Sequence, residues 1–181
     1  MEFPSRKPHR LKSFDYSTPG AYFITICTKD RKCILWDTVG ASIARPHKPP
    51  LSTWGQIVDN AVRNIPSHYP AVSVDRYAVM PNHVHLLLQI NTDADGRPMA
   101  APTISTVVQQ FKGIVSKQIG YSIWQKLFHD HVIRNEVDYV KIWQYIDNNP
   151  ISWQEDCFYA ESFQQNFECE SPYTVSTEET L

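Results

Sequence analysis

The amino-acid sequence predicts an α+β fold in which helices pack on an antiparallel β-sheet. Segments rich in β-branched and aromatic residues, which are typical of strands, are separated by segments whose apolar residues recur at helical spacing. Hydrophobic residues make up 42% of the 181-residue chain, which is enough to build a sizeable core. No apolar run approaches the roughly 18 residues that a membrane-spanning helix needs.

The expected elements follow one another in the order strand, helix, strand, strand, helix, strand, helix. They are predicted at residues 21–27, 53–65, 72–80, 83–90, 104–119, 127–133 and 136–148, with a further short strand at 33–36 and a Pro-rich loop at 40–51. Thr53 is expected to cap the first helix and Pro66 to end it, whereas Asn135 is expected to cap the last helix. This order is that of a ferredoxin-like arrangement, with the helices on one face of the sheet.

Charge is distributed unevenly along the chain. The net charge is −2, but 17 basic and 12 acidic residues precede Ile151, and seven acidic residues with no Lys or Arg follow from that position. The sequence therefore predicts one basic domain at residues 1–153 and an acidic tail at residues 154–181. The basic residues nearest the N-terminus form an arm that is suited to phosphates, although a solvated terminus explains them equally well. These residues are Arg6, Lys7, Arg10 and Lys12.

Cysteine usage and the N-terminus bear on the compartment. The four cysteines show no Cys-x-x-Cys spacing, so we expect reduced thiols without a structural zinc site. The N-terminus has charge but no apolar signal core, which predicts a cytoplasmic protein.

His83-Val84-His85 is the most informative stretch of the sequence. It begins a predicted strand with apolar residues on both faces, and side chains alternate along a strand, so the two histidines share one face. Two imidazoles one strand step apart can bind one metal ion. Two core histidines satisfied by their neighbours would show the same pattern.

Two segments in this order resemble the single-tyrosine HUH transposases of the IS200 type, and most closely the REP-associated tyrosine transposases. The segments are Met80-Pro81-Asn82-His83-Val84-His85 and Tyr145-Ile146-Asp147-Asn148-Asn149-Pro150. "HUH" denotes His, a bulky apolar residue and His, which His83, Val84 and His85 match. The resemblance covers roughly residues 11–153, most of the chain.

The resemblance implies metal-dependent nicking and strand transfer on single-stranded DNA through a 5′-phosphotyrosine intermediate. It implies that Tyr145 is the nucleophile and that His83 and His85 bind a divalent ion, Mg²⁺ or Mn²⁺. It further implies that Asn149, four residues after the tyrosine, completes the metal site. Pro150 is expected to bias Asn149 away from helical backbone.

The implied DNA partner carries hairpin or palindromic elements. REP-associated relatives are monomers, whereas mobile relatives exchange their tyrosine helices in a dimer, so the sequence leaves monomer and homodimer open. The acidic tail is expected to restrain access of DNA, unless its aromatic residues, Phe158 among them, pack into the core.

Further residues compete with these candidates. Tyr139 precedes Tyr145 by six residues and falls on another face of the helix, which disfavours a two-tyrosine enzyme. His129-Asp130-His131 repeats the His-x-His pattern and is an alternative metal site, whereas the resemblance implies packing or DNA contact at this place. Arg134 is a candidate phosphate contact, or the partner of Glu136 or Asp138 in a surface ion pair.

Two other functions remain open from the sequence. A DNA-binding regulator could keep this fold without cleavage, although His83, His85 and Tyr145 are all present. A histidine-dependent nucleotide phosphodiesterase would need His-x-His-x-His, and Leu87 occupies the third position.

Overall fold

A four-stranded antiparallel sheet lies at the centre of the computed structural model, which describes residues 14–37, 51–93, 102–153 and 158. Its strands, in the spatial order β2-β3-β1-β4, are all antiparallel to their neighbours. They are β1 (Gly20–Cys27), β2 (Val72–Val79), β3 (His83–Ile90) and β4 (His129–Ile133). The two central strands are almost entirely buried because both of their faces are covered. The predicted fold class is confirmed.

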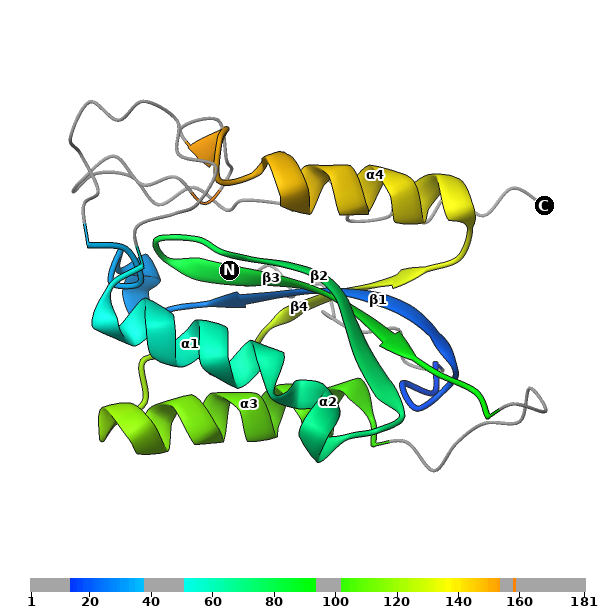
Figure 1. Cartoon of the computed structure of the whole chain (residues 1–181), viewed down its shortest axis with the longest axis horizontal. Coiled ribbons are helices and arrows are strands. Elements are labelled where there is room, and N and C mark those ends of the chain that lie inside the picture. Colours follow the sequence, from blue (N-terminus) through cyan, green and yellow to red (C-terminus); the bar gives the residue numbers. More distant parts are fainter. Residues whose placement is uncertain (1–13, 38–50, 94–101, 154–157, 159–181) are drawn as a thin grey trace, which may run out of the picture.

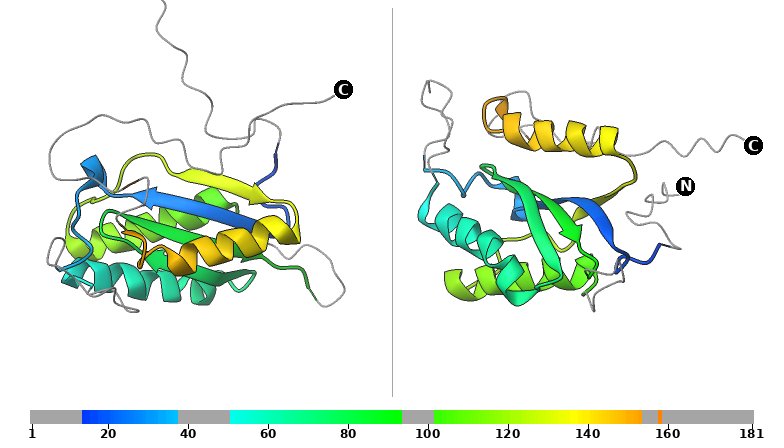
Figure 2. Two further views of the ribbon diagram at one scale, coloured as in Figure 1. Left: turned by 90° about the horizontal axis from the view of Figure 1, so that it is seen from above. Right: turned by 45° about the vertical axis from the view of Figure 1, so that its right-hand side comes forward.

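Helices cover both faces of this sheet (Figure 1). On one face lie α1 (Thr53–Arg63), the short α2 (Ile65–His68) and α3 (Ile104–Ile119). On the other face, α4 (Glu136–Asn148) contacts β2 and β3, as the two turned views in Figure 2 also show. The expectation that every helix lies on one face is therefore wrong for α4. An amphipathic pattern says that a helix buries one side, but not which face of the sheet it covers.

Three local expectations differ from the structure. Ser52, not Thr53, caps α1, since its hydroxyl accepts a hydrogen bond of 3.1 Å from the backbone N–H of Gly55. Pro66 does not end the helix, because α1 already ends at Arg63 and Pro66 lies in the first turn of α2, where its missing N–H is not needed. The expected strand at 33–36 is absent apart from one bridge between Trp36 and Leu51, and residues 40–50 of the expected loop lie outside the described residues.

The remaining helix boundaries agree with the sequence. Gly120 ends α3 in the left-handed conformation, with φ of 96°. Asn135 caps α4, and its side-chain oxygen accepts a hydrogen bond of 2.8 Å from the backbone N–H of Asp138. None of the helices described is long and apolar enough to cross a membrane.

Candidate active site

His83 and His85 lie on the face of β3 that α4 covers. Both side chains are buried, with exposed fractions of 0% and 1%. Their Nε2 atoms lie 2.9 Å apart, and their ring centroids are separated by 4.4 Å. The strand period thus places both rings on one face and within reach of one another, as the sequence predicts.

Asn82 determines which nitrogen of His83 carries the proton. The side-chain amide nitrogen of Asn82 donates a hydrogen bond of 2.8 Å to the backbone carbonyl of Phe158. The amide oxygen therefore faces Nδ1 of His83, 2.8 Å away, and can only accept. Nδ1 of His83 must carry the hydrogen, which leaves a lone pair on Nε2.

Thr25 is the matching partner of His85. Its hydroxyl oxygen lies 2.8 Å from Nδ1 of His85, which is its cross-strand neighbour on β3. A hydroxyl can either donate or accept, so two arrangements are possible, of which the second needs a cation between the two Nε2 atoms. In the first, Thr25 donates to Nδ1 while Nε2–H of His85 donates to His83. In the second, Nδ1–H donates to Thr25, and both Nε2 lone pairs converge.

Burial keeps both imidazoles uncharged. Loss of water is the largest cause that lowers the pKa of His83 well below 6.5, and His85 and the Arg31 guanidinium lower it further. Burial also lowers the pKa of His85 to about 3. At neutral pH both rings are neutral, which is the form that binds metal ions.

Tyr145 reaches this pair from α4. Its hydroxyl lies 3.4 Å from Nε2 of His85, and its ring centroid lies 5.3 Å from that of His85. Phe23 of β1 meets the tyrosine ring edge-on at 6.0 Å. The structure therefore brings a half-buried phenol and two neutral imidazoles together.

Tyr139, the other candidate tyrosine, lies elsewhere. Its hydroxyl donates a hydrogen bond of 2.9 Å to Asp75 of β2. Burial and this carboxylate raise the pKa of Tyr139 to about 12. A second contact between the same helix and strand is the ion pair of Arg76 with Asp147. Tyr139 thus helps to hold α4 against β2 rather than facing the histidines.

Asn149 follows Tyr145 by one turn. Its backbone is helical, with φ of −55° and ψ of −44°. Its backbone N–H donates a hydrogen bond of 3.0 Å to the carbonyl of Tyr145. The expected deflection by Pro150 is therefore wrong, because the restriction before proline is a preference that this hydrogen bond outweighs. Asn149 is 3% exposed, yet neither of its side-chain amide atoms has a hydrogen-bond partner among the residues that the structure describes.

These residues fit a divalent ion. Two ligand atoms about 2.1 Å from an ion and at right angles to each other lie about 3 Å apart, close to the separation of the two Nε2 atoms. Burying an amide without a hydrogen-bond partner costs free energy, and a bound ligand would remove that cost. Among the residues that the structure describes, no group of three or more His, Cys, Asp or Glu side chains could hold a metal. Asn149, whose buried amide has no partner among the described residues, therefore stays the predicted third ligand.

The segment after α4 also contributes to the site. Phe158 is 3% exposed, and its ring centroid lies 4.7 Å from that of His83, while Trp153 lies 5.9 Å from the same ring. For Phe158, the alternative that tail aromatics pack into the protein therefore holds. The other residues of the expected tail that bear on its role lie outside the described part of the chain.

The remaining candidates are not brought to the histidine pair. Nε2 of His131 lies 2.7 Å from a carboxylate oxygen of Asp138, and the ring centroid of His129 lies 6.4 Å from that of Phe158. Arg134 is exposed and follows β4 at the end of the sheet where Ala21 pairs with Ile133, whereas His83 pairs with Cys27 at the other end. Arg134 forms no ion pair with Glu136 or Asp138, both of which the structure describes. The basic arm of residues 6–12 lies outside the described residues.

Comparisons with known proteins agree with this fold. No family model matches the chain. An uncharacterized protein of Haemophilus influenzae is 31% identical over 175 residues, which cover 86% of this chain and 94% of that protein. A provisionally named REP-associated tyrosine transposase of the same organism is 27% identical over 146 residues, covering 76% of this chain and 73% of that protein.

A solved structure shares the fold. It is that of a REP-associated tyrosine transposase bound to a REP hairpin, with a TM-score of 0.58 and 21% identity, covering 81% of this chain and 74% of that one. The ferredoxin-like fold is therefore shared with a REP-associated tyrosine transposase. The chain belongs to one family with the uncharacterized protein of Haemophilus influenzae, and it is similar to REP-associated tyrosine transposases in sequence and in fold.

Proposed function

We propose that this protein nicks single-stranded DNA and transfers the cut strand through a covalent bond between Tyr145 and a 5′ phosphate. The observation that carries the proposal is the position of the Tyr145 hydroxyl, 3.4 Å from Nε2 of His85. A tyrosine nucleophile assisted by a metal ion needs neutral imidazoles close to its hydroxyl. The similarity to REP-associated tyrosine transposases supports the same reaction.

The reaction exchanges one ester for another. The Tyr145 oxygen attacks the phosphorus, and the phenolic proton is lost as the new O–P bond forms. The bond from phosphorus to the 3′ oxygen breaks, and that oxygen leaves as a hydroxyl. A 3′-OH can later attack the phosphotyrosine to rejoin a strand, so no nucleotide cofactor is needed. The contacts of α4 with Asp75 and Arg76 hold the tyrosine in position.

His83 and His85, through Nε2, and Asn149, through its amide oxygen, are the residues that would hold Mg²⁺ or Mn²⁺. Such an ion supplies Lewis-acid polarisation of the phosphate when it is bound. Asn82 and Thr25 orient the two rings toward it, because each can accept the Nδ1 hydrogen of its histidine.

The proposed substrate is single-stranded DNA next to a hairpin. The solved relative is bound to a REP hairpin, and it shares this fold. Within the described residues, α4 packs on β2 and β3 of its own chain, so Tyr145 reaches the histidines of the same chain. This arrangement supports a monomer that cleaves in cis.

A cleavage assay with end-labelled hairpin DNA and Mn²⁺ tests the proposal. We expect a covalent protein–DNA adduct that mass spectrometry assigns to Tyr145. Tyr145→Phe should abolish the adduct and retain DNA binding, because only the hydroxyl is lost. Tyr139→Phe is the matched control and should still form the adduct. A wild-type protein that binds the DNA without an adduct would instead be a regulator of the same fold.

A further inference from the structure

The turn that follows β1 has an unusual backbone. It contains the single-turn helix η1 (Lys29–Arg31), in which Asp30 and Arg31 have φ of 57° and 51°. Among the described residues, these are the only residues other than glycine with a positive φ. Side chains other than glycine are disfavoured there, and such strain persists where the surrounding structure enforces it, often at functional sites.

Thr28 enforces this conformation and ties the turn to the histidine pair. Thr28 is fully buried, and its hydroxyl oxygen lies 2.9 Å from the backbone carbonyls of both Lys32 and Asn82, which share its single hydrogen. The backbone N–H of Thr28 donates to the same Asn82 carbonyl, also at 2.9 Å. Asn82 therefore holds the turn with its backbone and His83 with its side chain, so the two positions are coupled.

Arg31 lies beside the site. The guanidinium carbon is 5.2 Å from the centroid of the Phe158 ring, which itself packs against His83. The side chain is half-buried, and it makes no ion pair within the part of the chain that the structure describes. Stacking uses the flat face of a guanidinium and leaves the N–H groups at its edge free to bind an anion.

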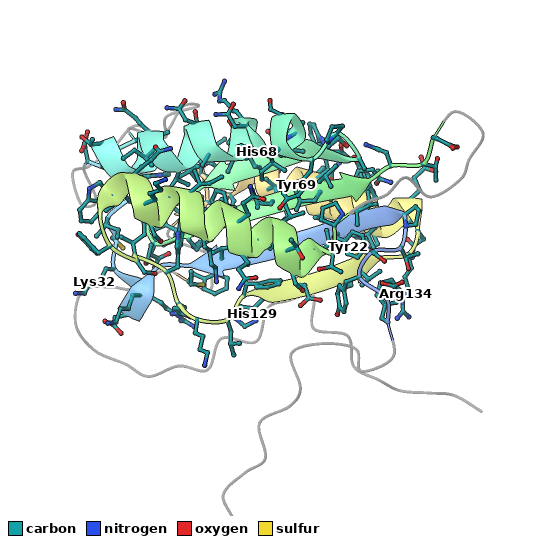
Figure 3. All side chains as sticks on the ribbon, turned by 90° about the horizontal axis from the view of Figure 1, so that it is seen from below. Tyr22, Lys32, His68, Tyr69, His129 and Arg134 are labelled. Atoms are coloured by element: carbon teal, nitrogen blue, oxygen red, sulfur yellow. The ribbon has the colours of Figure 1, made fainter. Side chains whose placement is uncertain are left out.

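Two lysines extend this charge outward. Lys29 and Lys32 flank Arg31 and are exposed, with Asp30 as the one acidic residue of the turn. Lys32 projects from one end of the molecule, and Arg134 lies at the opposite end (Figure 3). Positive charge next to the site is therefore supplied by this turn and not by Arg134.

We propose that the turn from Thr28 to Lys32 is a phosphate-binding rim of the active site. Arg31 binds a backbone phosphate of the single strand next to the one that Tyr145 attacks, and Lys29 and Lys32 contact phosphates further along. The inference rests on the proposed function, since it takes single-stranded DNA as the ligand. It adds the residues that hold the strand, which the sequence patterns did not reveal.

DNA binding at several salt concentrations tests the rim. All variants are made in the Tyr145→Phe protein, so that binding is measured without cleavage, and fluorescence anisotropy of a labelled hairpin with a single-stranded flank gives Kd. Arg31→Gly should weaken binding about tenfold and lower the slope of log Kd against log salt by about 0.7, the value for one phosphate contact on a single strand. Arg31→Lys keeps the charge but loses the paired N–H groups, so its loss should be smaller. Lys32→Ala should also lower the slope.

Thermal unfolding separates a binding role from a structural one. Glycine is the residue that tolerates a φ of 51°, so Arg31→Gly should keep or raise Tm while DNA binding falls. Lys117→Ala is the matched control, because Lys117 is exposed on α3, on the other face of the sheet. It should change neither Tm nor the salt slope beyond the small effect of one distant charge.

The outcomes of these experiments separate the two proposals. The rim is overturned if Arg31→Gly and Lys32→Ala bind DNA as Lys117→Ala does while the wild-type protein still forms its adduct. It is also overturned if binding falls only in proportion to a loss of folded protein. A wild-type chain that neither binds nor cleaves single-stranded DNA would instead overturn the proposed function itself.

Discussion

His83 and His85 are basic side chains that the fold keeps neutral. Burial separates both rings from water, and each Nδ1 has one polar partner, Asn82 or Thr25. A metal ion would need these lone pairs, whereas a proton would add charge to a ring that burial has separated from water. The same burial therefore links the chemistry of the pair to the stability of the protein.

Stability of the metal-free protein should fall as pH decreases below 6.5. In the folded protein the pKa of His83 is well below 6.5, and that of His85 is about 3. As the pH falls, the unfolded chain therefore binds protons that the native state does not bind. The stabilisation is nearly complete at pH 7.5, and about 1.4 kcal/mol per histidine should be lost between pH 7.5 and 5.5. Urea unfolding in EDTA at these pH values measures the loss. His85→Gln should reduce the slope; equal slopes for the variant and the wild type would contradict the prediction.

Thr25→Val should weaken metal binding with little effect on folding. Valine fills the same space but cannot accept the Nδ1 hydrogen of His85, so the arrangement with two converging lone pairs loses its support. Loss of such a partner typically costs 10-fold to 100-fold in affinity. Titration of the protein with Mn²⁺ gives Kd, and ¹⁵N NMR of the imidazoles reports which nitrogen carries hydrogen. Thr25→Ser, which keeps the hydroxyl, should bind Mn²⁺ almost as the wild type does.

The sequence predicts the residues of this site better than their partners. Alternation along a strand is enough to place His83 and His85 on one face. Thr25 becomes the partner of His85 only through the register between β1 and β3, and Asn82 acts through a carbonyl 76 residues later. The register between two strands and the packing of Phe158 against Asn82 are tertiary contacts, which a local sequence pattern cannot predict.

At the scale of elements, α1 and α3 make different demands on their glycines. Gly55 lies in the first turn of α1, and a Cβ at this position would collide with the backbone carbonyl of Leu35. Gly113 lies in α3, where a Cβ would meet nothing within 4 Å. The first glycine is therefore required by the close approach of two backbones, and the second is not.

Alanine substitutions should separate these two glycines. Gly55→Ala should destabilise the protein by more than 2 kcal/mol, a rough figure for a core clash that only a backbone shift can relieve. Gly113→Ala should stabilise it by about 0.5–1 kcal/mol, because alanine is the better helix former. Chemical denaturation of both variants measures the difference. Similar effects of the two substitutions would show that α1 does not need this contact.

Element boundaries were predictable where a local chemical signal exists. Gly120 and Asn135 end and begin helices through their own conformation and side chain, so their roles can be read from the sequence. The face that α4 covers depends instead on Asp75 and Arg76 of β2, whose contacts with the helix span more than 60 residues. The helix was therefore predicted correctly, but its place in the fold was not.

At the scale of the whole molecule, α4 and the histidines form one site within one chain. Mixing Tyr145→Phe with His85→Ala should therefore restore no cleavage, because each protein lacks one half of a site that its own chain must complete. Adduct formation on hairpin DNA, with each variant alone as the control, measures this. Recovered activity in the mixture would instead show that the tyrosine helix is exchanged between two subunits.

The long reach of the site has a consequence for the order in which it is made during translation. Thr25 leaves the ribosome early, His83 and His85 follow, and Tyr145 and Phe158 are added more than a hundred residues after Thr25. Because synthesis proceeds from the N-terminus and β1 must pair with both β3 and β4, a nascent chain that ends before α4 holds histidines without a nucleophile. Under the proposed function, incomplete products of translation would consequently be unable to cut DNA, since cleavage would require the tyrosine helix to have docked.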